Sequence, residues 1–238
     1  MTSEYDNQAQ ALKWVPFFSK LLPEEASDLA RHLVRRRFST GQIIFHHGDP
    51  GGLLYIIEKG KVKIAHTTSD GNEALLAILG AGDYFGELAL LDEYPRSATA
   101  EALAPTETLT LGREVFMRYI HSNPEFALHV LRTLAQHIRR LNSQISDTFF
   151  LDLSGRLART LLYLAEQHGK VTKDGIVIDV SLTQTDLAEM TGATRVSINK
   201  TLGRFRQAKW IKTKSRRFII LDQQALIKTT QVSGDTAF

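Results

Sequence analysis

The chain has 238 residues, which is long for one typical domain and enough for two that each bury a hydrophobic core. Its net charge of +3 conceals an asymmetry, because residues 151–238 carry 14 basic and 8 acidic side chains and residues 1–150 are therefore net −3. Any nucleic-acid-binding surface is expected in the C-terminal part. The absence of cysteine excludes disulfides, thiolate metal sites, cysteine nucleophiles and cysteine-held iron–sulfur clusters.

The N-terminal segment lacks targeting features. Residues 1–10 are polar and acidic, and no stretch of the chain approaches ~18 uninterrupted apolar residues. We therefore expect a cytoplasmic protein that does not bind membranes. Residues 1–12 are expected to form a flexible tail, as are residues 226–238. Between them, the Pro-Glu-Glu start of Pro23–Arg35 favours an amphipathic helix.

Short apolar runs dominate the segment that follows. Nine glycines between Gly41 and Gly86 separate runs such as Ile43–Phe45, Leu53–Ile57 and Lys61–Ile64. Strands at this spacing are typical of a β-sandwich or jelly roll. We predict one β domain over residues 13–122.

After Asn123 and Pro124 the apolar period changes from two to seven. Apolar residues recur at steps of 3, 4, 3 and 4, namely Leu131, Leu134, Ile138, Leu141 and Ile145. This spacing is that of a coiled-coil seam, and the other positions are largely polar. Packing against its own domain would also explain one apolar stripe, but the polar remainder favours a homodimerisation helix over residues 123–150.

The heptad pattern ends near Phe149–Asp152, which we interpret as a hinge. Asp152 is a plausible N-cap for a helix over Leu153–His168. A turn and a short strand over Ile176–Ile178 follow, then a helix-turn-helix and a basic hairpin over Trp210–Leu221. We predict that residues 151–225 form a winged helix-turn-helix domain.

The helix-turn-helix has specific local signals. Thr183 with Asp186 resembles a capping box, Gly192 permits the tight turn, and Thr194 can cap the second helix. From Arg195 to Arg217 the chain carries nine basic residues and no acid, which favours double-stranded DNA as the partner. The predicted DNA-binding residues are Gln184, Thr185, Arg195, Val196, Ser197, Asn199, Lys200, Lys214 and Arg216.

On that second helix, the side chains opposite the apolar stripe would face a major groove. Arg195 would pair with guanine, Asn199 with adenine, and Val196 would contact a thymine methyl. Lys214 and Arg216 on the hairpin would contact phosphates without reading sequence. A charged face that is merely solvated is the alternative interpretation.

A second group of residues, between Phe85 and Ala98, favours a phosphate ligand. Gly86 allows backbone to approach a ligand, and the amides of Glu87, Leu88 and Ala89 open a short helix whose start favours an anion. Arg96 and Ser97 would hold phosphate oxygens, and Glu87 would accept from a ribose hydroxyl. A Glu87–Arg96 salt bridge across the turn is the purely structural alternative.

The run Phe85–Ala98 resembles the phosphate-binding cassette of cyclic-nucleotide-binding domains. The segment Phe150–Arg156 and the helix-turn-helix resemble bacterial regulators of the cyclic-AMP receptor protein (Crp/Fnr) family, and the likeness covers residues 13 to about 222. The resemblance implies an α+β fold with an N-terminal β jelly roll, a long dimerisation helix and a C-terminal winged helix-turn-helix. It also implies a homodimer on palindromic sites, RNA polymerase as a partner, and no metal or enzyme activity.

The resemblance implies ligand roles for Glu87, Arg96 and Ser97, and cyclic AMP as the first candidate effector. Two residues on the dimer helix contact the purine in such regulators, commonly Thr-Ser or Thr-Asn, where this chain has Leu141 and Asn142. Asn142 can still bond an adenine. Another nucleotide or small anion, and a ligand-independent regulator, stay open as alternatives. The recognition helix also departs from the family pattern, so we expect half-sites other than TGTGA.

A haem or redox sensor on the same scaffold is an alternative from another class. Without cysteine it would depend on His46 and His47 in a strand, or on His129 and His137 on the dimer helix. An enzyme is a third class. The sequence contains no nucleotide-hydrolysis loop, metal-ligand spacing or nucleophile elbow, so we do not expect an enzyme.

Overall fold

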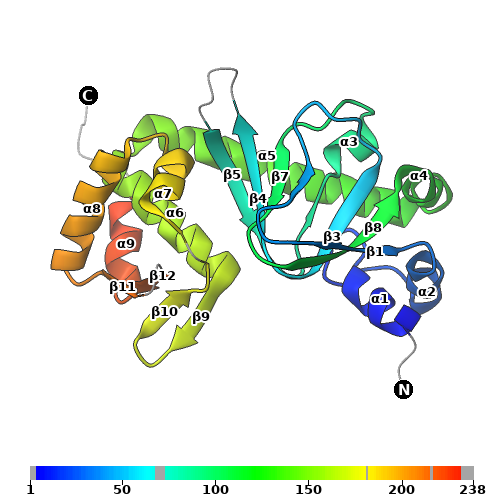
Figure 1. Cartoon of the computed structure of the whole chain (residues 1–238), viewed down its shortest axis with the longest axis horizontal. Coiled ribbons are helices and arrows are strands. Elements are labelled where there is room, and N and C mark those ends of the chain that lie inside the picture. Colours follow the sequence, from blue (N-terminus) through cyan, green and yellow to red (C-terminus); the bar gives the residue numbers. More distant parts are fainter. Residues whose placement is uncertain (1–3, 68–72, 181, 215–216, 232–238) are drawn as a thin grey trace. The chain divides into compact units, whose positions relative to one another are not determined.

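The computed structural model describes residues 4–67, 73–180, 182–214 and 217–231. The chain divides into two compact units, Met1–Arg139 and Arg140–Phe238, and the long helix α5 (Pro124–Phe150) begins in the first and ends in the second. Figure 1 shows strands and helices in both units. The predicted α+β class is confirmed.

Two four-stranded antiparallel sheets form the first unit. One has the order β1-β8-β3-β6 and consists of β1 (Val34–Phe38), β8 (Thr106–Gly112), β3 (Leu53–Lys59) and β6 (Tyr84–Phe85). The other has the order β2-β7-β4-β5 and consists of β2 (Ile43–Phe45), β7 (Thr99–Ala102), β4 (Val62–Thr67) and β5 (Glu73–Leu79). The helices of this unit are α1 (Glu4–Leu12), α2 (Pro23–Ala30), α3 (Leu88–Leu91), α4 (Arg113–Ser122) and the first half of α5.

Strand β3 shows how the sequence builds this arrangement. Successive side chains of a strand point to opposite faces of the sheet. Leu54 and Ile56 accordingly join a cluster with phenylalanines of the helical segments, whereas Tyr55 and Ile57 join a cluster with Val62 of the other sheet. Because both faces of β3 are covered, this strand is a continuous apolar run rather than an alternating one.

Helix α5 starts as the sequence suggests. Pro124 is its first residue, and the Asn123 side chain accepts from the Phe126 amide (3.0 Å). Phe126 and Val130 are buried in the core of the first unit, and Leu134 packs against that core. The sequence pattern places Leu134 in the intermolecular seam. In the structure it packs partly within its own unit, because it follows Val130 by one helical turn.

The second unit holds the helix-turn-helix. Its helices after α5 are α6 (Leu153–His168), α7 (Gln184–Thr191), α8 (Arg195–Gln207) and α9 (Gln223–Thr229). A four-stranded antiparallel sheet has the order β11-β12-β10-β9 and consists of β11 (Ile211–Lys214), β12 (Arg217–Ile220), β10 (Gly175–Ile178) and β9 (Gly169–Thr172). The predicted hairpin after the second helix of the motif is confirmed as β11–β12.

Local capping explains where these helices begin. The Asp152 carboxylate accepts from the Gly155 amide (2.8 Å) at the start of α6, as predicted. Thr183 and Asp186 form the predicted capping box of α7, with the Thr183 amide donating to Asp186 (2.7 Å). Such caps satisfy amides that have no partner inside the helix.

The structure departs from two sequence expectations at the ends of the chain. Residues 4–12, expected within a tail, form α1, because Ala11 and Leu12 are buried in the core of the first unit. Residues 226–229, expected within the C-terminal tail, belong to α9, because Leu226 is fully buried. Residues 1–3 and 232–238 lie outside the described residues.

The expected helix over Pro23–Arg35 ends at Ala30, since the chain turns into β1.

Candidate functional site

The predicted phosphate cassette begins with Phe85, the last residue of β6, and Gly86 follows between β6 and α3. Gly86 has φ +84°, a left-handed conformation that favours glycine. A Cβ atom there would lie 2.6 Å from Nη1 of Arg96 and 2.9 Å from the Leu53 carbonyl oxygen. The position therefore requires glycine for its backbone conformation and also for space. Gly86 therefore lies next to both strand β3, through Leu53, and the cassette arginine, Arg96.

Arg96 is buried, with 4% of its surface exposed, although it is a charged residue. Nη1 donates to the Gly86 carbonyl oxygen and Nη2 to that of Leu53, each at 2.9 Å. The guanidinium carbon lies 4.2 Å from the centre of the Phe45 ring. Among the described residues Nε has no acceptor. The guanidinium is thus fixed in place with donor capacity still unused.

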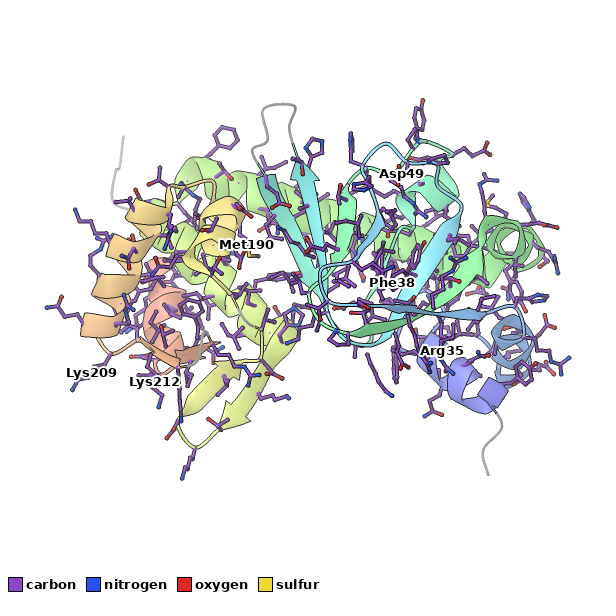
Figure 2. The ribbon with its side chains drawn as sticks, in the orientation of Figure 1. Arg35, Phe38, Asp49, Met190, Lys209 and Lys212 are labelled. Atoms are coloured by element: carbon purple, nitrogen blue, oxygen red, sulfur yellow. The ribbon has the colours of Figure 1, made fainter. Side chains whose placement is uncertain are left out.

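The backbone of Arg96 is held as firmly as its side chain. Its amide donates to the Asp49 carbonyl oxygen and its own carbonyl accepts from Gly48, each at 2.9 Å. Figure 2 shows Asp49 in the loop beside the short helix α3. Ser97, the next residue, is exposed. The two residues predicted to hold phosphate oxygens therefore differ, because one is anchored inside and the other lies at the surface.

Glu87 is half-buried and precedes α3. Burial raises the pKa of its carboxyl group, while a hydrogen bond from its own backbone amide and the positive charge of Arg96 act in the opposite direction. The two side chains form no ion pair, because the Arg96 guanidinium donates to main-chain carbonyls instead. The structural alternative of a salt bridge across the turn is therefore wrong.

Replacing Glu87 by Gln is expected to raise the melting temperature at neutral pH. The raised pKa means that the folded chain holds this proton more tightly than the unfolded chain. The stability that the carboxyl contributes is therefore fully present below its ordinary pKa of 4.5 and is lost as the pH rises through the raised value. Thermal unfolding of both proteins at neutral pH and near pH 4.5 should show a gap that shrinks in acid.

The exposed carboxylate of Glu114 provides the control for that measurement. Glu114→Gln should bring no gain in melting temperature at neutral pH. A Glu87→Gln protein that is less stable than the wild type at neutral pH would show that burial does not penalise the ionised carboxylate.

The two remaining cassette residues take different positions. Leu88 is 45% exposed, whereas Ala89 is buried. Gly51 passes so close to Ala89 that a Cβ on the glycine would overlap its methyl group. The amides of Leu88 and Ala89 are the first of α3 and have no acceptor inside the helix, as at every helix start.

One contact near the cassette was not foreseen from the sequence. The Tyr84 hydroxyl lies 3.4 Å from Nε2 of His137, and the two rings are nearly parallel. Tyr84 is the first residue of β6 and directly precedes Phe85 and Gly86, whereas His137 lies on α5. This pair joins the cassette strand to the long helix within the first unit. Residues 53 positions apart leave no local signal of such a contact.

Asn142 and Leu141 lie in the second unit, on the exposed part of α5. The side chain of Leu141 is 54% exposed. The purine-contact role of Asn142 stays a prediction.

The predicted DNA-reading face lies on α8. Arg195, Asn199 and Lys200 are exposed, and Val196 is 79% exposed. The opposite side is buried, by Ile198, Leu202 and Phe205. The exposed face of α8 thus carries one apolar side chain, Val196, beside the basic side chains of Arg195 and Lys200.

Some of these side chains already have partners. Nε2 of Gln184 donates to Oδ1 of Asn199 (3.1 Å), which joins the start of α7 to the exposed face of α8. The Ser197 amide donates to the Thr194 hydroxyl (3.2 Å), so Ser197 takes part in the cap of α8. Thr185 is exposed. Gly192 takes the left-handed conformation predicted for the turn, with φ +62°.

The hairpin after α8 adds further positive charge. Lys214 is exposed at the end of β11, and Arg216 lies outside the described residues. Figure 2 shows Lys209 and Lys212 at the turn after α8 and on β11. Lys212 is partly neutralised by Asp174 at 3.2 Å.

Two arginines that the sequence analysis did not select brace the helix-turn-helix. Arg156 on α6 donates to the carbonyl oxygens of Leu151 (3.0 Å) and Thr191 (3.2 Å). Arg204 on α8 donates to the Ser154 hydroxyl (3.0 Å). Both contacts connect the segment after α5 to the two helices of the motif. The contacts with Thr191 and Ser154 join residues 35 and 50 positions apart, so spacing alone does not indicate them.

The histidines considered for a haem or redox site have other neighbours. The ring of His47 lies 4.8 Å from that of His66, and His137 contacts Tyr84. Within the described parts of the chain, no three residues among histidine, aspartate and glutamate are grouped to hold a metal ion. None of the helices described has the length and apolar character of a membrane span.

Known protein families match both the N-terminal and the C-terminal part of the chain. The cyclic nucleotide-binding domain family matches residues 35–123, and the Crp-like helix-turn-helix domain family matches residues 155–229. A CRP-like cAMP-activated global transcriptional regulator of Mycobacterium tuberculosis is 35% identical over 211 residues, which are 89% of this chain and 94% of the relative. A cyclic AMP receptor protein of Thermus thermophilus is 34% identical, over 80% of this chain and 85% of the relative.

A solved structure supports the same relationship. A CRP-family transcriptional regulator from Thermus thermophilus has a TM-score of 0.67 and 30% identity, and the match covers 82% of this chain and 96% of that one. The likeness thus extends over most of the length of both chains. The chain belongs to the Crp/Fnr family of DNA-binding transcriptional regulators, with a cyclic nucleotide-binding domain followed by a Crp-like helix-turn-helix domain.

Proposed function

We propose that the protein is a homodimeric transcriptional regulator whose DNA binding is controlled by a cyclic nucleotide, with cyclic AMP as the effector. The observation that carries the proposal is the buried Arg96 guanidinium, which is fixed by two carbonyls and retains an Nε without an acceptor. A buried donor without a partner is costly, and an anion would relieve that cost. The Mycobacterium tuberculosis relative, at 35% identity, is named as cAMP-activated.

The cassette residues suit the parts of a cyclic nucleotide. Arg96 and Ser97 would hold the cyclic phosphate, with the amides of Leu88 and Ala89 beside it. Glu87 would accept a hydrogen bond from the ribose hydroxyl, and Gly86 would leave room for the ligand. Asn142 would bond the purine. When bound, the nucleotide would supply one negative charge and a set of acceptors at a site that otherwise presents donors.

The exposed apolar side of α5 supports a homodimer. Four residues of the predicted seam are more than half exposed: Leu131 (62%), Ile138 (58%), Leu141 (54%) and Ile145 (56%). Burying this exposed apolar stripe against the same stripe of a second copy would be favourable, because it removes apolar surface from water. Twofold symmetry would place two α8 helices on one palindromic DNA site, about 34 Å apart.

On DNA, Arg195 and Asn199 would read bases, and Val196 would contact a thymine methyl. Gln184 would orient Asn199 through their hydrogen bond. The remaining predicted contacts, Thr185, Ser197, Lys200, Lys214 and Arg216, would bind phosphates and fix the register. RNA polymerase is the partner expected of a regulator of this family.

The hinge over Phe149–Asp152 would transmit the signal. A ligand that binds the DNA-competent conformation more tightly than the other shifts the equilibrium towards DNA binding. Arg156 would carry the change from the Leu151 carbonyl to α7, since it donates to both.

Leu141 favours a second candidate, a regulator of the same family that binds DNA without cyclic AMP. It has no hydroxyl to contact a purine, and its burial in a dimer seam would contribute about 1.5–3 kcal/mol without any ligand. Such a protein would respond to another nucleotide or to no ligand.

Calorimetric titration of nucleotide-stripped protein with cyclic AMP separates the two candidates. We expect saturable binding of one nucleotide per chain. An absence of heat up to millimolar cyclic AMP, with the protein folded and dimeric, would reject cyclic AMP as the effector and leave the second candidate.

A further inference from the structure

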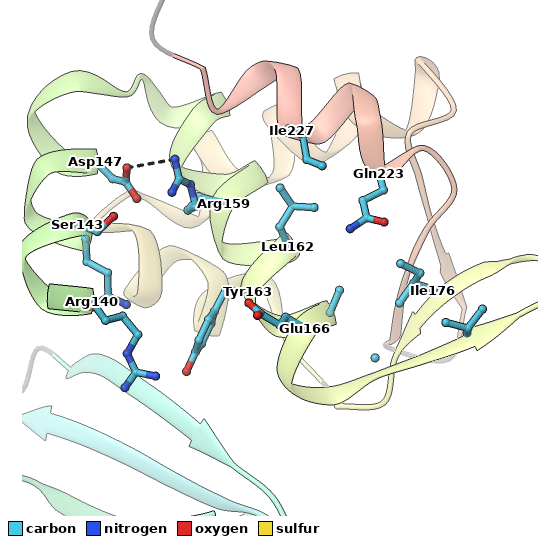
Figure 3. A pocket seen from close by; sticks show the side chains of 14 residues that line it. Arg140, Ser143, Asp147, Arg159, Leu162, Tyr163, Glu166, Ile176, Gln223 and Ile227 are labelled. Atoms are coloured by element: carbon cyan, nitrogen blue, oxygen red, sulfur yellow. Dashed lines mark ion pairs between the residues drawn. The ribbon is translucent and has the colours of Figure 1, made fainter. Parts of the chain in front are cut away.

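A groove in the second unit has no part in the functions above. It lies between the last turns of α5, one side of α6, the β9–β10 hairpin and α9, as Figure 3 shows. Its volume is about 630 Å³. Sites for small organic molecules occupy roughly 300–1,000 Å³. The groove is therefore large enough for one such molecule.

The proposed dimer seam is not expected to cover this groove. Arg140 and Asp147 are the charged residues that α5 contributes to it, and they lie seven positions apart on one face. At about 100° per residue, that face is more than about 90° around the helix from Leu141 and Ile145. A second copy paired through the seam would leave Arg140 and Asp147 accessible.

One end of the groove is apolar. Leu162 from α6, Ile176 from β10 and Ile227 from α9 converge there, each half-buried, as Figure 3 shows. Val171 at the rim is 87% exposed. Removing such surface from water is favourable, so this end suits an apolar ring or chain.

The other end presents donors that lack acceptors. Arg159 on α6 faces Asp147 at 3.5 Å and the Thr230 carbonyl oxygen at 3.5 Å, both long contacts. Its Nε is buried and has no acceptor among the described residues. Arg140 lies 5.8 Å from the centre of the Tyr163 ring, and it makes no ion pair within the described residues. Arg140 lies against Tyr163 and Arg159 against Asp147, at separate places on this side of the groove (Figure 3). Arg140 is the exposed cation whose donors are left for a ligand.

The acids nearby do not fill that capacity. Asp147 forms its ion pair with Arg159 (3.5 Å) rather than with Arg140, and Glu166 is exposed at the rim, where water screens its charge. A bound carboxylate or sulfonate has acceptors in the fork geometry that arginine prefers. The chemistry therefore favours an occupant with one anionic group and an apolar body.

We propose that this groove is a second effector site, which binds a small amphiphilic organic anion such as an aromatic carboxylate or sulfonate. Its anionic group would lie against the exposed guanidinium of Arg140, beside the Tyr163 ring, and its apolar body against Leu162, Ile176 and Ile227. The site does not depend on a nucleotide in the β domain.

The position of the groove gives it a regulatory consequence. Arg140 and Asp147 precede the hinge, whereas Arg159 and Leu162 follow it. An occupant that contacts both helices stabilises one angle between α5 and α6. Because α6 carries the helix-turn-helix, that angle affects DNA binding. By reciprocity, the occupant would change DNA affinity by the same factor as DNA changes the affinity for the occupant.

Fluorescence titration with 1-anilinonaphthalene-8-sulfonate tests the proposal on the full-length protein. This probe has an apolar ring system and one sulfonate, and its emission rises in apolar surroundings. We expect saturable binding that persists at saturating cyclic AMP. Arg140→Gln and Ile227→Glu should each weaken it about tenfold, since one removes a charged donor and the other places a charge at the apolar end.

Leu76→Glu is the matched control, because Leu76 is an exposed apolar residue of the first unit at 54% exposure. It should leave probe binding unchanged. Arg140 is exposed, so its substitution does not threaten folding. Displacement of the probe by cyclic AMP, equal loss in Leu76→Glu, or no saturation would each overturn the proposal. DNA affinity that is the same with and without bound probe would overturn its regulatory role.

Discussion

Arg96→Gln is expected to weaken cyclic AMP binding by about 100-fold or more. The change removes the positive charge and the two-nitrogen fork that would hold the phosphate, and a hydrogen bond to a charged group contributes about 1.5–3 kcal/mol. The variant should also lose about 1–3 kcal/mol of stability, because the carbonyl oxygens of Gly86 and Leu53 would lose a donor. Calorimetry and thermal unfolding measure the two effects separately.

Two further variants test whether the loss of affinity comes from the guanidinium group of Arg96. Arg96→Lys keeps the charge without the fork, and should fall between the wild type and Arg96→Gln in affinity. Arg36→Gln changes an exposed arginine on β1 of the same unit and should bind as the wild type does. A folded Arg96→Gln protein with affinity within about threefold of the wild type would show that the cassette does not bind the phosphate through Arg96.

Ile138→Asp is expected to convert the proposed dimer into monomers and to abolish tight binding to palindromic DNA. Ile138 is 58% exposed in the single chain, so the substitution should leave the fold of each unit intact. In a paired seam the same position would bury an uncompensated charge from each copy, at about 3–5 kcal/mol, which is more than ~100-fold in dimer dissociation. Sedimentation equilibrium and DNA titration measure the two consequences.

Gln136→Asp is the matched control, because it places the same charge on the exposed polar side of the same helix. At about 100° per residue, position 136 lies opposite Leu141. It should remain dimeric and bind DNA as the wild type does. If Ile138→Asp stays dimeric at the concentrations used for the wild type, the chain pairs through another surface.

The features that the sequence predicted well are those set by neighbouring residues. The capping box of Thr183 and Asp186 and the N-cap at Asp152 depend on residues three positions away. Gly192 in the turn depends on its own backbone conformation. Each of these is a local requirement, so a single sequence is enough to find it.

The features that it missed depend on contacts between distant segments. Leu226 looks like part of a polar tail, and only the packed second unit shows that it is buried. The sequence singled out Arg96 for the cassette, but its hydrogen-bond partner Leu53 lies 43 positions away. The same holds for Tyr84 and His137. Packing of this kind is decided by the tertiary structure rather than by propensity.

The two arginines of the groove, Arg140 and Arg159, illustrate this limit again. In sequence they are ordinary charged residues on two predicted helices. Only the fold brings them to the lining of one groove that also has an apolar end. A chain with a nucleotide cassette at one end would then have a second point of control next to its hinge.

The affinity of the protein for a palindromic genomic DNA fragment, measured with and without cyclic AMP at fixed salt, tests ligand-controlled DNA binding most directly. Salt must be held constant because phosphate contacts make affinity depend steeply on it. We predict that cyclic AMP tightens binding about tenfold or more, within the usual range of allosteric coupling. Sequence-specific binding of equal affinity with and without the nucleotide would contradict control by cyclic AMP and identify a constitutive regulator or one that responds to another signal.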